Sequence, residues 1–213
     1  MSKKSNRSKK SSSWLSKQNQ DPYIIKSRKE GYRSRAAYKL LEINEKDHIF
    51  KSGMIVIELG SAPGGWSQVI AELVGNNGHV YALDILPMVP IQTKYNNITF
   101  IQGDFTLDNI RQQLMELNLL KKVDAVISDM SPNLTGIATV DQINSVNLIE
   151  LAYTFAKDVL KKDGVFLCKA FYGASFENLV KDIRQNFTKV LIRKPNASRT
   201  ESKEVYLVAR GYN

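Results

Sequence analysis

Strand-like and helix-like segments alternate along most of the chain, and this alternation limits the choice of fold more than any other feature. Apolar, β-branched runs predict seven strands, at 54–59, 79–84, 98–104, 123–129, 165–171, 188–194 and 204–210. Helical periodicity predicts helices at about 34–44, 65–73, 107–118, 141–160 and 175–186. Strands that are apolar on both faces and separated by helices are typical of a parallel sheet with helices on both sides.

The end of the chain departs from this alternation. Strands 188–194 and 204–210 are joined by a stretch that lacks helical pattern and is too short for a helical crossover, so they should pair antiparallel. The sequence therefore predicts an α/β fold: a Rossmann-like, mostly parallel, seven-stranded sheet with an antiparallel C-terminal strand. Two local signals accompany it, with Ser34 as N-cap of the first helix and Gly164 as a left-handed stop after the helix 141–160.

Positive charge is concentrated at the N-terminus. The chain holds 30 Lys and Arg against 21 Asp and Glu, a net charge of +9, and residues 1–35 alone carry this whole excess. Such a distribution is typical of proteins that bind a polyanion, although a solvated tail that only aids solubility would look the same. We expect two units: residues 1–33, a basic and largely disordered arm that binds nucleic acid, and residues 34–213, a globular domain.

Composition excludes several classes of protein. The single cysteine, Cys168, cannot form an intrachain disulfide or a cysteine-rich metal site, and it suggests a reducing compartment. With only two histidines besides, no metal centre is expected. No apolar run approaches the roughly 18 residues of a membrane span, and no apolar stretch follows the basic start as in a signal peptide. We therefore expect a cytoplasmic protein and, without a heptad pattern, a monomer.

A glycine-rich turn follows the first strand, in the sequence ELGSAPGGW (58–66). Gly60 and Gly64 can bring the backbone close to a ligand at the carboxyl edge of the sheet, where ligands bind in this class of fold. The spacing matches neither the dinucleotide-binding pattern nor a P-loop. Glycines alone would equally suit an ordinary turn. The neighbouring residues therefore decide between an ordinary turn and a ligand-binding loop.

Acidic residues end the next three strands: Asp84, Asp104 and Asp129. Asp84 stands where an acid accepts hydrogen bonds from ribose hydroxyls, and Asp104 is placed to face an adenine edge. Asp129 would lie beside the reacting part of the ligand. Each acid alone could be a helix N-cap or a turn residue, but together they favour a nucleotide-like ligand. An acidic rim suits a ligand with a cation, such as a sulfonium, better than one with a pyrophosphate.

Lys169 interrupts an apolar strand near its carboxyl end, where a lysine is costly to bury unless it is paired. Strand alternation sends Cys168 to the opposite face, so Cys168 is interpreted as a buried small hydrophobe and not as a nucleophile. Lys169 could simply extend its amine to solvent, or it could act as a base near neutral pH. Glu204 and Lys39 could reach the same edge, although each alone would more often be a solvated charge.

Seven motifs in order resemble the FtsJ-type ribose 2′-O-methyltransferases, and the likeness extends from about Trp14 to the end of the chain. They are RSRAAYKLLEI (33–43), ELGSAPGGWSQ (58–68), DILPM (84–88), QGDF (102–105), SDMSPN (128–133), CKAF (168–171) and RKPNASRTESKEVY (193–206). Ser61 in the glycine loop and Cys168 before the lysine are small departures from the family pattern.

The resemblance implies S-adenosylmethionine (SAM) as methyl donor for a methyltransferase domain at 34–213, without a metal. It implies a Lys-Asp-Lys-Glu tetrad of Lys39, Asp129, Lys169 and Glu204, with Lys169 as general base. It places the cofactor on Gly60, Gly64, Trp66, Asp84, Asp104 and Asp129. Related enzymes modify ribosomal or transfer RNA, and overall likeness favours a uridine of 23S rRNA in the large ribosomal subunit. Phosphate contacts are expected from the arm and from five residues: Arg33, Arg35, Arg193, Lys194 and Arg199.

Two other functions are compatible with the same sheet. A non-catalytic ribosome-assembly factor would bind rRNA without chemistry, but it would have no reason to keep a lysine inside a strand. An NAD-dependent oxidoreductase would need the dinucleotide glycine pattern, which is absent, and would not need a basic arm.

Overall fold

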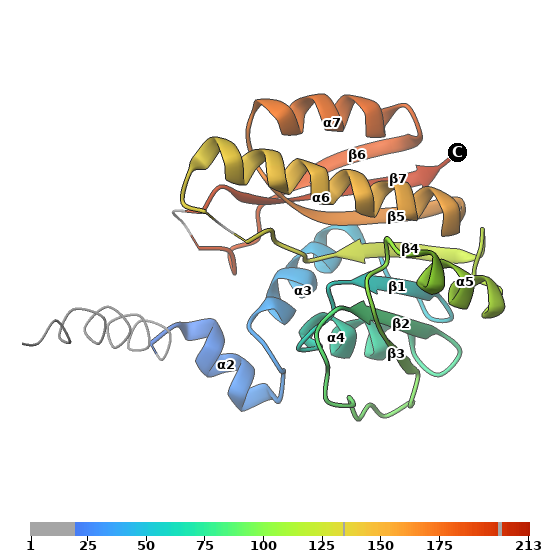
Figure 1. Cartoon of the computed structure of the whole chain (residues 1–213). Coiled ribbons are helices and arrows are strands. Elements are labelled where there is room, and N and C mark those ends of the chain that lie inside the picture. The colour runs from blue at the N-terminus through green and yellow to red at the C-terminus, as the bar shows by residue number, and fades with distance from the viewer. Residues whose placement is uncertain (1–19, 134, 200–201) are drawn as a thin grey trace, which may run out of the picture.

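A seven-stranded sheet forms the centre of the molecule, and helices cover both of its faces (Figure 1). The computed structural model describes residues 20–133, 135–199 and 202–213. The strands are β1 (Ile55–Leu59), β2 (His79–Asp84), β3 (Ile98–Gln102), β4 (Val123–Ser128), β5 (Leu160–Phe171), β6 (Phe187–Arg193) and β7 (Glu204–Tyr212). The helices are α2 (Pro22–Glu30), α3 (Ala36–Asp47), α4 (Gly65–Val74), α5 (Asp108–Glu116), α6 (Ala138–Val159) and α7 (Ala174–Arg184).

The sheet has the order β3-β2-β1-β4-β5-β7-β6, which confirms the predicted α/β fold. The first five strands pair parallel, whereas β7 lies antiparallel between β5 and β6. The predicted antiparallel pairing of the last two strands is therefore also confirmed. Because β7 inserts between β5 and β6, its first residues come to lie beside the carboxyl end of β5.

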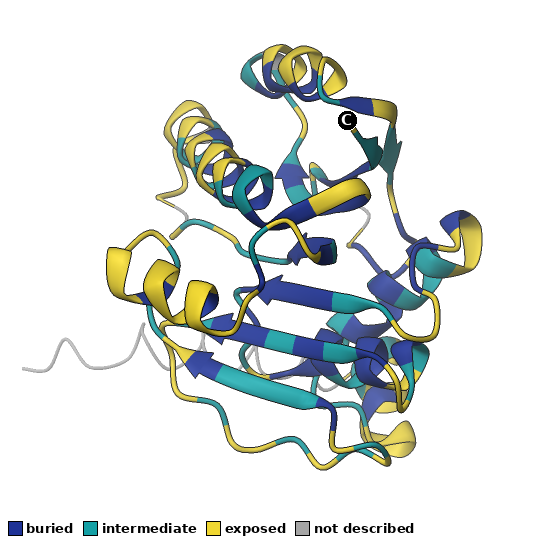
Figure 2. Cartoon of the chain, turned by 90° about the vertical axis from the view of Figure 1, so that its right-hand side faces the viewer, coloured by how far each residue is buried: buried dark blue, intermediate teal, exposed yellow. Residues whose placement is uncertain are grey.

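Alternating side chains of the strands build two separate apolar cores. One core joins Val56, Ile127 and Leu167 to α3 and α4, and the other joins their neighbours Ile57, Val126 and Phe166 to α5, α6 and α7. Figure 2 shows the central strands buried and the outer sides of the helices exposed. The long apolar runs of the sequence follow directly from this burial on both faces.

The pairing register determines which residues of β7 lie opposite Lys169. Lys169 pairs with Tyr206 across the β5–β7 ladder, and Tyr206 pairs with Arg193 across the β6–β7 ladder. Residues directly opposite each other share a face of the sheet, and so do residues two apart in one strand. Lys169, Tyr206 and Glu204 therefore lie on the face that carries α3, while Cys168 is buried in the opposite core as expected.

Two boundary predictions are wrong. Helix α6 ends at Val159, and β5 begins at Leu160, because Leu160 already pairs with Val123 across an irregular part of the β4–β5 ladder. The left-handed residue there is Asp163, with φ of 64°, and it lies inside the strand instead of ending a helix. Helix α3 starts after Arg35, and no side chain forms its N-terminal cap, so Ser34 does not act as the N-cap.

The second half of the expected arm is folded. Asp21 caps α2 by accepting a hydrogen bond from Tyr23 N at 3.0 Å, and Gly31 ends the helix with φ of 77°. The Tyr38 hydroxyl donates to Glu30 at 2.8 Å, which fixes α2 to α3. Residues 1–19, the first part of the expected disordered arm, lie outside the described residues. None of the described helices is long and apolar enough to cross a membrane.

Arg193 belongs to an ion pair that fastens β6 to the end of α3. Its guanidinium donates to both carboxylate oxygens of Asp47, at 2.6 and 2.7 Å, and the Asp47 side chain is only 4% exposed. The hydrogen bonds from Arg193, followed by the charge of Asp47, raise the pKa of the guanidinium despite partial burial. Most donors of the Arg193 guanidinium are used inside the protein, so we expect Arg193 to stabilise the fold and not to contact an RNA phosphate.

Replacing Arg193 should therefore affect stability and not RNA affinity. Arg193→Ala leaves a buried carboxylate unpaired and should lower the free energy of unfolding by about 3 kcal/mol, the low end for a buried pair because Arg193 itself is 29% exposed. Urea denaturation measures this change. Adding Asp47→Asn should recover part of the loss because the unpaired charge is then removed. An Arg193→Ala chain of unchanged stability but weakened RNA binding would contradict this assignment.

Candidate active site

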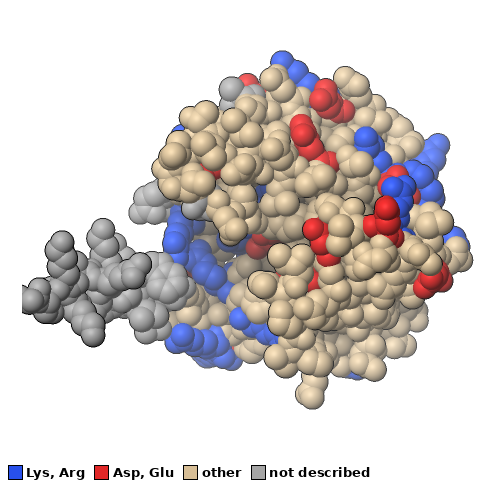
Figure 3. Space-filling model, in the orientation of Figure 1, with Lys and Arg blue, Asp and Glu red and all other residues tan. Residues whose placement is uncertain are grey.

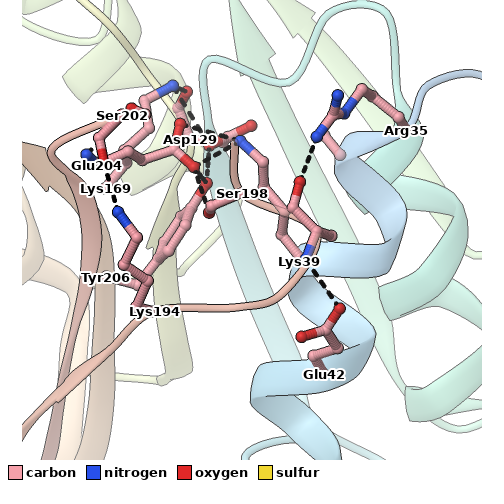
Figure 4. Close-up of polar contacts among 12 residues, drawn as sticks. Arg35, Lys39, Glu42, Asp129, Lys169, Lys194, Ser198, Ser202, Glu204 and Tyr206 are labelled. Carbon is pink, nitrogen blue, oxygen red and sulfur yellow. Dashed lines mark hydrogen bonds and ion pairs between the residues drawn. The ribbon is translucent and has the colours of Figure 1, made fainter. Parts of the chain in front are cut away.

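The four tetrad residues meet at the carboxyl end of the sheet as two ion pairs (Figure 4). Lys39 of α3 reaches Glu204 at the start of β7, with Nζ at 2.7 Å from Oε1 and 2.9 Å from Oε2. Lys169 of β5 donates to the backbone oxygen of Asp129 at 2.5 Å and lies 3.3 Å from its carboxylate. All four side chains are less than one-fifth exposed, so these charges interact more strongly than surface pairs.

Tyr206 joins the two pairs, and sequence reasoning missed it. Its hydroxyl donates to Asp129 Oδ1 at 2.7 Å and lies 3.4 Å from Glu204 Oε1. The residue is fully buried, with its ring against Trp66 at 5.7 Å between centroids. Burial, and then the two neighbouring carboxylates, raise the pKa of Tyr206 well above its ordinary value, so the hydroxyl keeps its proton. Its position two residues after Glu204 was the available signal.

One face of α3 holds the chain segment that leads into β7. The spacing of Arg35, Lys39 and Glu42 places all three on one side of the helix. Glu42 accepts hydrogen bonds from the backbone of Asn196 and Ala197, at 2.6 and 3.0 Å, and Arg35 donates to the Ala197 oxygen. The helix therefore positions both Lys39 and its partner Glu204.

Glu204 is held in its ionised form. Burial favours the neutral acid, but the charge of Lys39 opposes it, together with hydrogen bonds from Lys39 and Ser198 and the charge of Lys169. The net result lowers the pKa of Glu204. The Ser198 hydroxyl donates to Glu204 at 2.7 Å, a second contact that sequence reasoning missed.

A cavity of about 350 Å³ opens beside the tetrad. It is lined by Lys39 and Glu204 together with Arg35, Ala36, Ser131, Phe171, Arg199 and Ser202. A larger cavity of about 500 Å³ lies between α5 and α6 and contains none of the tetrad residues. The smaller cavity is the candidate site for chemistry, because Lys39 and Glu204 line it together with other polar and charged side chains.

The expected cofactor residues lie around the loop that follows β1. Gly60 and Gly64 both have positive φ, 75° and 100°, which favours glycine. A Cβ on Gly60 would lie 2.3 Å from Met130 Cγ, so a side chain there would collide with the residue after Asp129. The Asp84 carboxylate accepts from Ala62 N and from Leu86 N, both at 2.8 Å, and so fixes the loop beside the end of β2.

The Asp104 side chain lies just after β3, whereas the Trp66 side chain is buried beneath the glycine loop. Asp104 follows β3 and accepts from the Thr106 backbone and hydroxyl with one oxygen, at 2.9 and 2.7 Å. Trp66 is 2% exposed, and its indole donates to Ala36 O at 2.8 Å. The Trp66 side chain therefore packs the loop against α3, which leaves its backbone as the part that could touch a cofactor.

The residues present suit a cationic nucleoside better than a phosphate or a metal. Asp84, Asp104 and Asp129 end three strands on one edge, and acids can accept from ribose and amino groups and stabilise a positive charge. The glycine turns give a ligand access to the backbone. Within 20–133, 135–199 and 202–213, no group of three His, Cys, Asp or Glu side chains could hold a metal ion.

The remaining basic residues expected at the RNA surface divide into two kinds. Arg199 is exposed and lines the tetrad cavity, and Arg35 lines it while paired with Asp21. Lys194 donates to the backbone oxygen of Ser202, a residue that also lines the tetrad cavity. Arg33 instead donates to three backbone oxygens close to the glycine loop. Figure 3 shows Lys and Arg gathered on the side where α2 and α3 lie.

Glu58 is a buried acid beneath the glycine loop that sequence reasoning did not use. It lies in β1, is 1% exposed, and accepts a hydrogen bond from the Ser67 hydroxyl of α4. Burial raises the pKa of Glu58 to about 8; the Ser67 hydrogen bond opposes this, and the negative charges of Asp129 and Asp84 add to it. The Glu58 carboxyl is therefore mostly protonated at pH 7, so the side chain beneath the glycine loop is mostly uncharged.

This acid should make the stability of the chain depend on pH. The folded chain keeps the Glu58 proton up to about pH 8, whereas the unfolded chain releases it near the ordinary pKa of 4.5. Stability should therefore fall, by on the order of a few kcal/mol, as pH rises through this window. Glu58→Gln should flatten the dependence when Tm is measured across it, while Ser67→Ala should leave the slope in place. An unchanged slope in Glu58→Gln would contradict the assignment.

Comparisons with known proteins identify the family of the chain. Residues 32–212 match the FtsJ-like methyltransferase family model. The chain is 50% identical to ribosomal RNA large subunit methyltransferase E of Marinobacter nauticus, over 97% of this chain and 98% of that protein. It is 48% identical to the enzyme of the same name from Legionella pneumophila, over 98% and 99%.

Solved structures give the same result. A ribosomal RNA methyltransferase of Plasmodium falciparum superposes with a TM-score of 0.75 and 32% identity, over 85% of this chain and 98% of that one. Fibrillarin of Methanococcus jannaschii, at 19% identity and a TM-score of 0.53, shares the fold alone. The family match covers the whole of the sheet and every member of the tetrad, and the chain belongs to the FtsJ-like methyltransferase family.

Proposed function

We propose that the chain transfers a methyl group from SAM to the ribose 2′-hydroxyl of a uridine in 23S rRNA of the large ribosomal subunit. The observation that carries the proposal is the pair of lysine–carboxylate contacts, Lys39–Glu204 and Lys169–Asp129, joined by Tyr206 beside the glycine loop. The names of the relatives support a large-subunit rRNA substrate.

SAM fits the residues around the loop after β1. Asp84 and Asp104 would hold the nucleoside, Gly60, Gly64 and the backbone of Trp66 would allow close approach, and Asp129 would lie near the sulfonium. When bound, SAM supplies an activated methyl carbon whose bond to sulfur breaks as the ribose oxygen attacks it.

Lys169 is proposed as the general base. To act as a base, the Lys169 ammonium that pairs with Asp129 must first release a proton to solvent. The neutral amine then has two N–H groups and one lone pair, and Asp129 offers two acceptors, its backbone oxygen and its carboxylate. With both N–H groups directed at Asp129, the lone pair is free to take the proton of the 2′-hydroxyl. Asp129 thus orients the base, and Tyr206 holds the Asp129 carboxylate in turn.

Lys39 and Glu204 position the target hydroxyl. Both line the cavity of about 350 Å³, and their contact of 2.7 Å keeps each in place. The Lys39 ammonium can donate to the ribose oxygen and stabilise the negative charge that develops as its proton leaves. Much of the rate enhancement should come from this positioning, because the methyl group is already activated.

RNA is proposed to lie across the tetrad cavity. Arg35 and Arg199 line it and Lys194 lies near it, so phosphates beside the target ribose would meet positive charge. The basic segment 1–33 would extend this surface. We further propose that the protein acts as a monomer in the cytoplasm, where ribosomal subunits are found.

Removing the proposed base should abolish chemistry and spare cofactor binding. Lys169→Ala should lower methyl transfer by about 10²–10⁴-fold while SAM affinity changes little. Transfer would be measured with radiolabelled SAM on large subunits that lack the modification, beside free rRNA and transfer RNA. Lys181→Ala, an exposed lysine on α7, serves as the matched control and should behave as wild type.

The outcomes separate the competing functions. Label on the subunit that is lost in Lys169→Ala supports the proposal, and near-normal transfer by that variant would contradict the base assignment. Label on transfer RNA alone would keep the chemistry and change the substrate. SAM binding without transfer to any RNA would favour a non-catalytic assembly factor, and stabilisation by NAD instead of SAM would favour an oxidoreductase.

Arg199 should contribute to RNA affinity through charge alone. Arg199→Ala should weaken RNA binding severalfold and reduce the slope of log affinity against log salt by about one, with SAM affinity unchanged. Filter binding or fluorescence anisotropy at three salt concentrations measures both quantities. A slope equal to that of the wild type would contradict a phosphate contact by Arg199.

A further inference from the structure

The segment between β2 and β3 forms a wall beside the glycine loop. Met88 and Ile91 of this segment lie against Gly64, where a Cβ would be 3.0 Å from Met88 Sδ and 2.5 Å from Ile91 Cδ1. The segment starts directly after Asp84, whose carboxylate holds the same loop. Residues 85–91 therefore pack against the glycine loop, and a shift of this segment would change the space beside the loop that is proposed for SAM.

This wall has little structure of its own. Residues 85–97 contain neither helix nor strand, and three large apolar side chains are exposed: Ile85 (67%), Leu86 (59%) and Val89 (75%). Apolar side chains in water give no packing energy that would hold a loop in place. Its position must therefore depend on contacts from outside the segment.

Arg33 supplies those contacts. Its guanidinium donates from Nη1 to Val89 O at 2.5 Å and to Pro63 O at 3.2 Å, and from Nη2 to Pro90 O at 2.6 Å. Pro63 belongs to the glycine loop, so a single side chain contacts both the loop and the segment. In the part of the chain that the structure describes, the hydrogen bonds that reach the backbone of residues 87–92 come from Arg33.

The backbone of Arg33 is fixed in turn. Arg33 N donates to Gln68 Oε1 of α4 at 2.8 Å, and Gln68 Nε2 donates back to Gly31 O at 3.2 Å. Helix α4 begins at the end of the glycine loop. The Arg33 backbone is thus tied to α4 at the end of the glycine loop, and its side chain reaches segment 85–92.

We propose that Arg33 is a positioning residue for the cofactor: it holds segment 85–92 against the glycine loop and so sets SAM affinity, instead of binding an RNA phosphate. The planar guanidinium can address three carbonyl oxygens in different directions at once, whereas a lysine ammonium is a compact charge on a flexible stem. This inference rests on SAM as the proposed cofactor.

The test compares Arg33→Ala and Arg33→Lys with the wild-type chain. SAM affinity, measured by titration calorimetry without RNA, should fall roughly tenfold in Arg33→Ala, since the site loses its preorganisation. Arg33→Lys keeps the charge and should still be weakened severalfold. In steady state the KM for SAM should rise while kcat and the KM for RNA stay close to wild type. Arg199→Ala is the reverse control, because it should alter RNA binding and leave SAM affinity unchanged.

Backbone mobility tests the tether without any ligand. NMR order parameters of the Met88, Val89 and Ile91 amides should fall in both Arg33 variants, while those of β1 and α4 keep their wild-type values. Unchanged order parameters in this segment, or wild-type SAM affinity combined with a smaller salt slope for RNA, would overturn the proposal and return Arg33 to the phosphate contacts. Failure of the wild-type chain to bind SAM would instead overturn the proposed cofactor, a result that the NMR experiment distinguishes.

Discussion

The candidate active site depends on a hydroxyl placed between two carboxylates. Tyr206 has one proton to donate, and it lies closer to Asp129 than to Glu204, 2.7 Å against 3.4 Å. Two acids this close and this buried would repel each other, so each needs a cation of its own. Lys169 and Lys39 provide these cations, and the result is a cluster of two positive and two negative groups with no net charge. This balance allows the four side chains to be mostly buried, because the free energy of burying an isolated charge is far higher than that of burying a paired one.

This balance explains why the site draws on both ends of the chain. Lys39 comes from the first helix after the arm, and Glu204 and Tyr206 come from the last strand. Only the insertion of β7 between β5 and β6 brings Tyr206 opposite Lys169. Helix α3 then completes the arrangement, because Glu42 holds the segment that leads into β7. The antiparallel strand is thus the element that turns a general ligand-binding sheet into this particular site.

The sequence could predict the parts of the molecule that depend on local pattern. Apolar runs and helical periodicity predicted the α/β class and the antiparallel pairing of the last two strands, and the strand-end acids indicated a candidate ligand edge. Register, however, is set by packing between distant segments, so the pairing of Lys169 with Tyr206 has no signature in either strand alone. The same reason explains the boundary between α6 and β5. Leu160 reads as the last apolar residue of a helix, but its partner Val123 in the neighbouring strand draws it into the sheet.

The arginines show most clearly what the charges counted in a sequence cannot predict. Net charge marks the N-terminal segment as basic, yet it cannot distinguish a guanidinium that faces solvent from one that donates to protein oxygens. Arg193 is paired with buried Asp47, and Arg33 donates to three backbone carbonyls. Arginine suits both roles because its five donors can satisfy acceptors inside the protein as readily as phosphates outside it. The surface proposed for RNA is therefore narrower than the number of Lys and Arg residues implies, and it centres on the cavity that Arg199 and Arg35 line beside the tetrad.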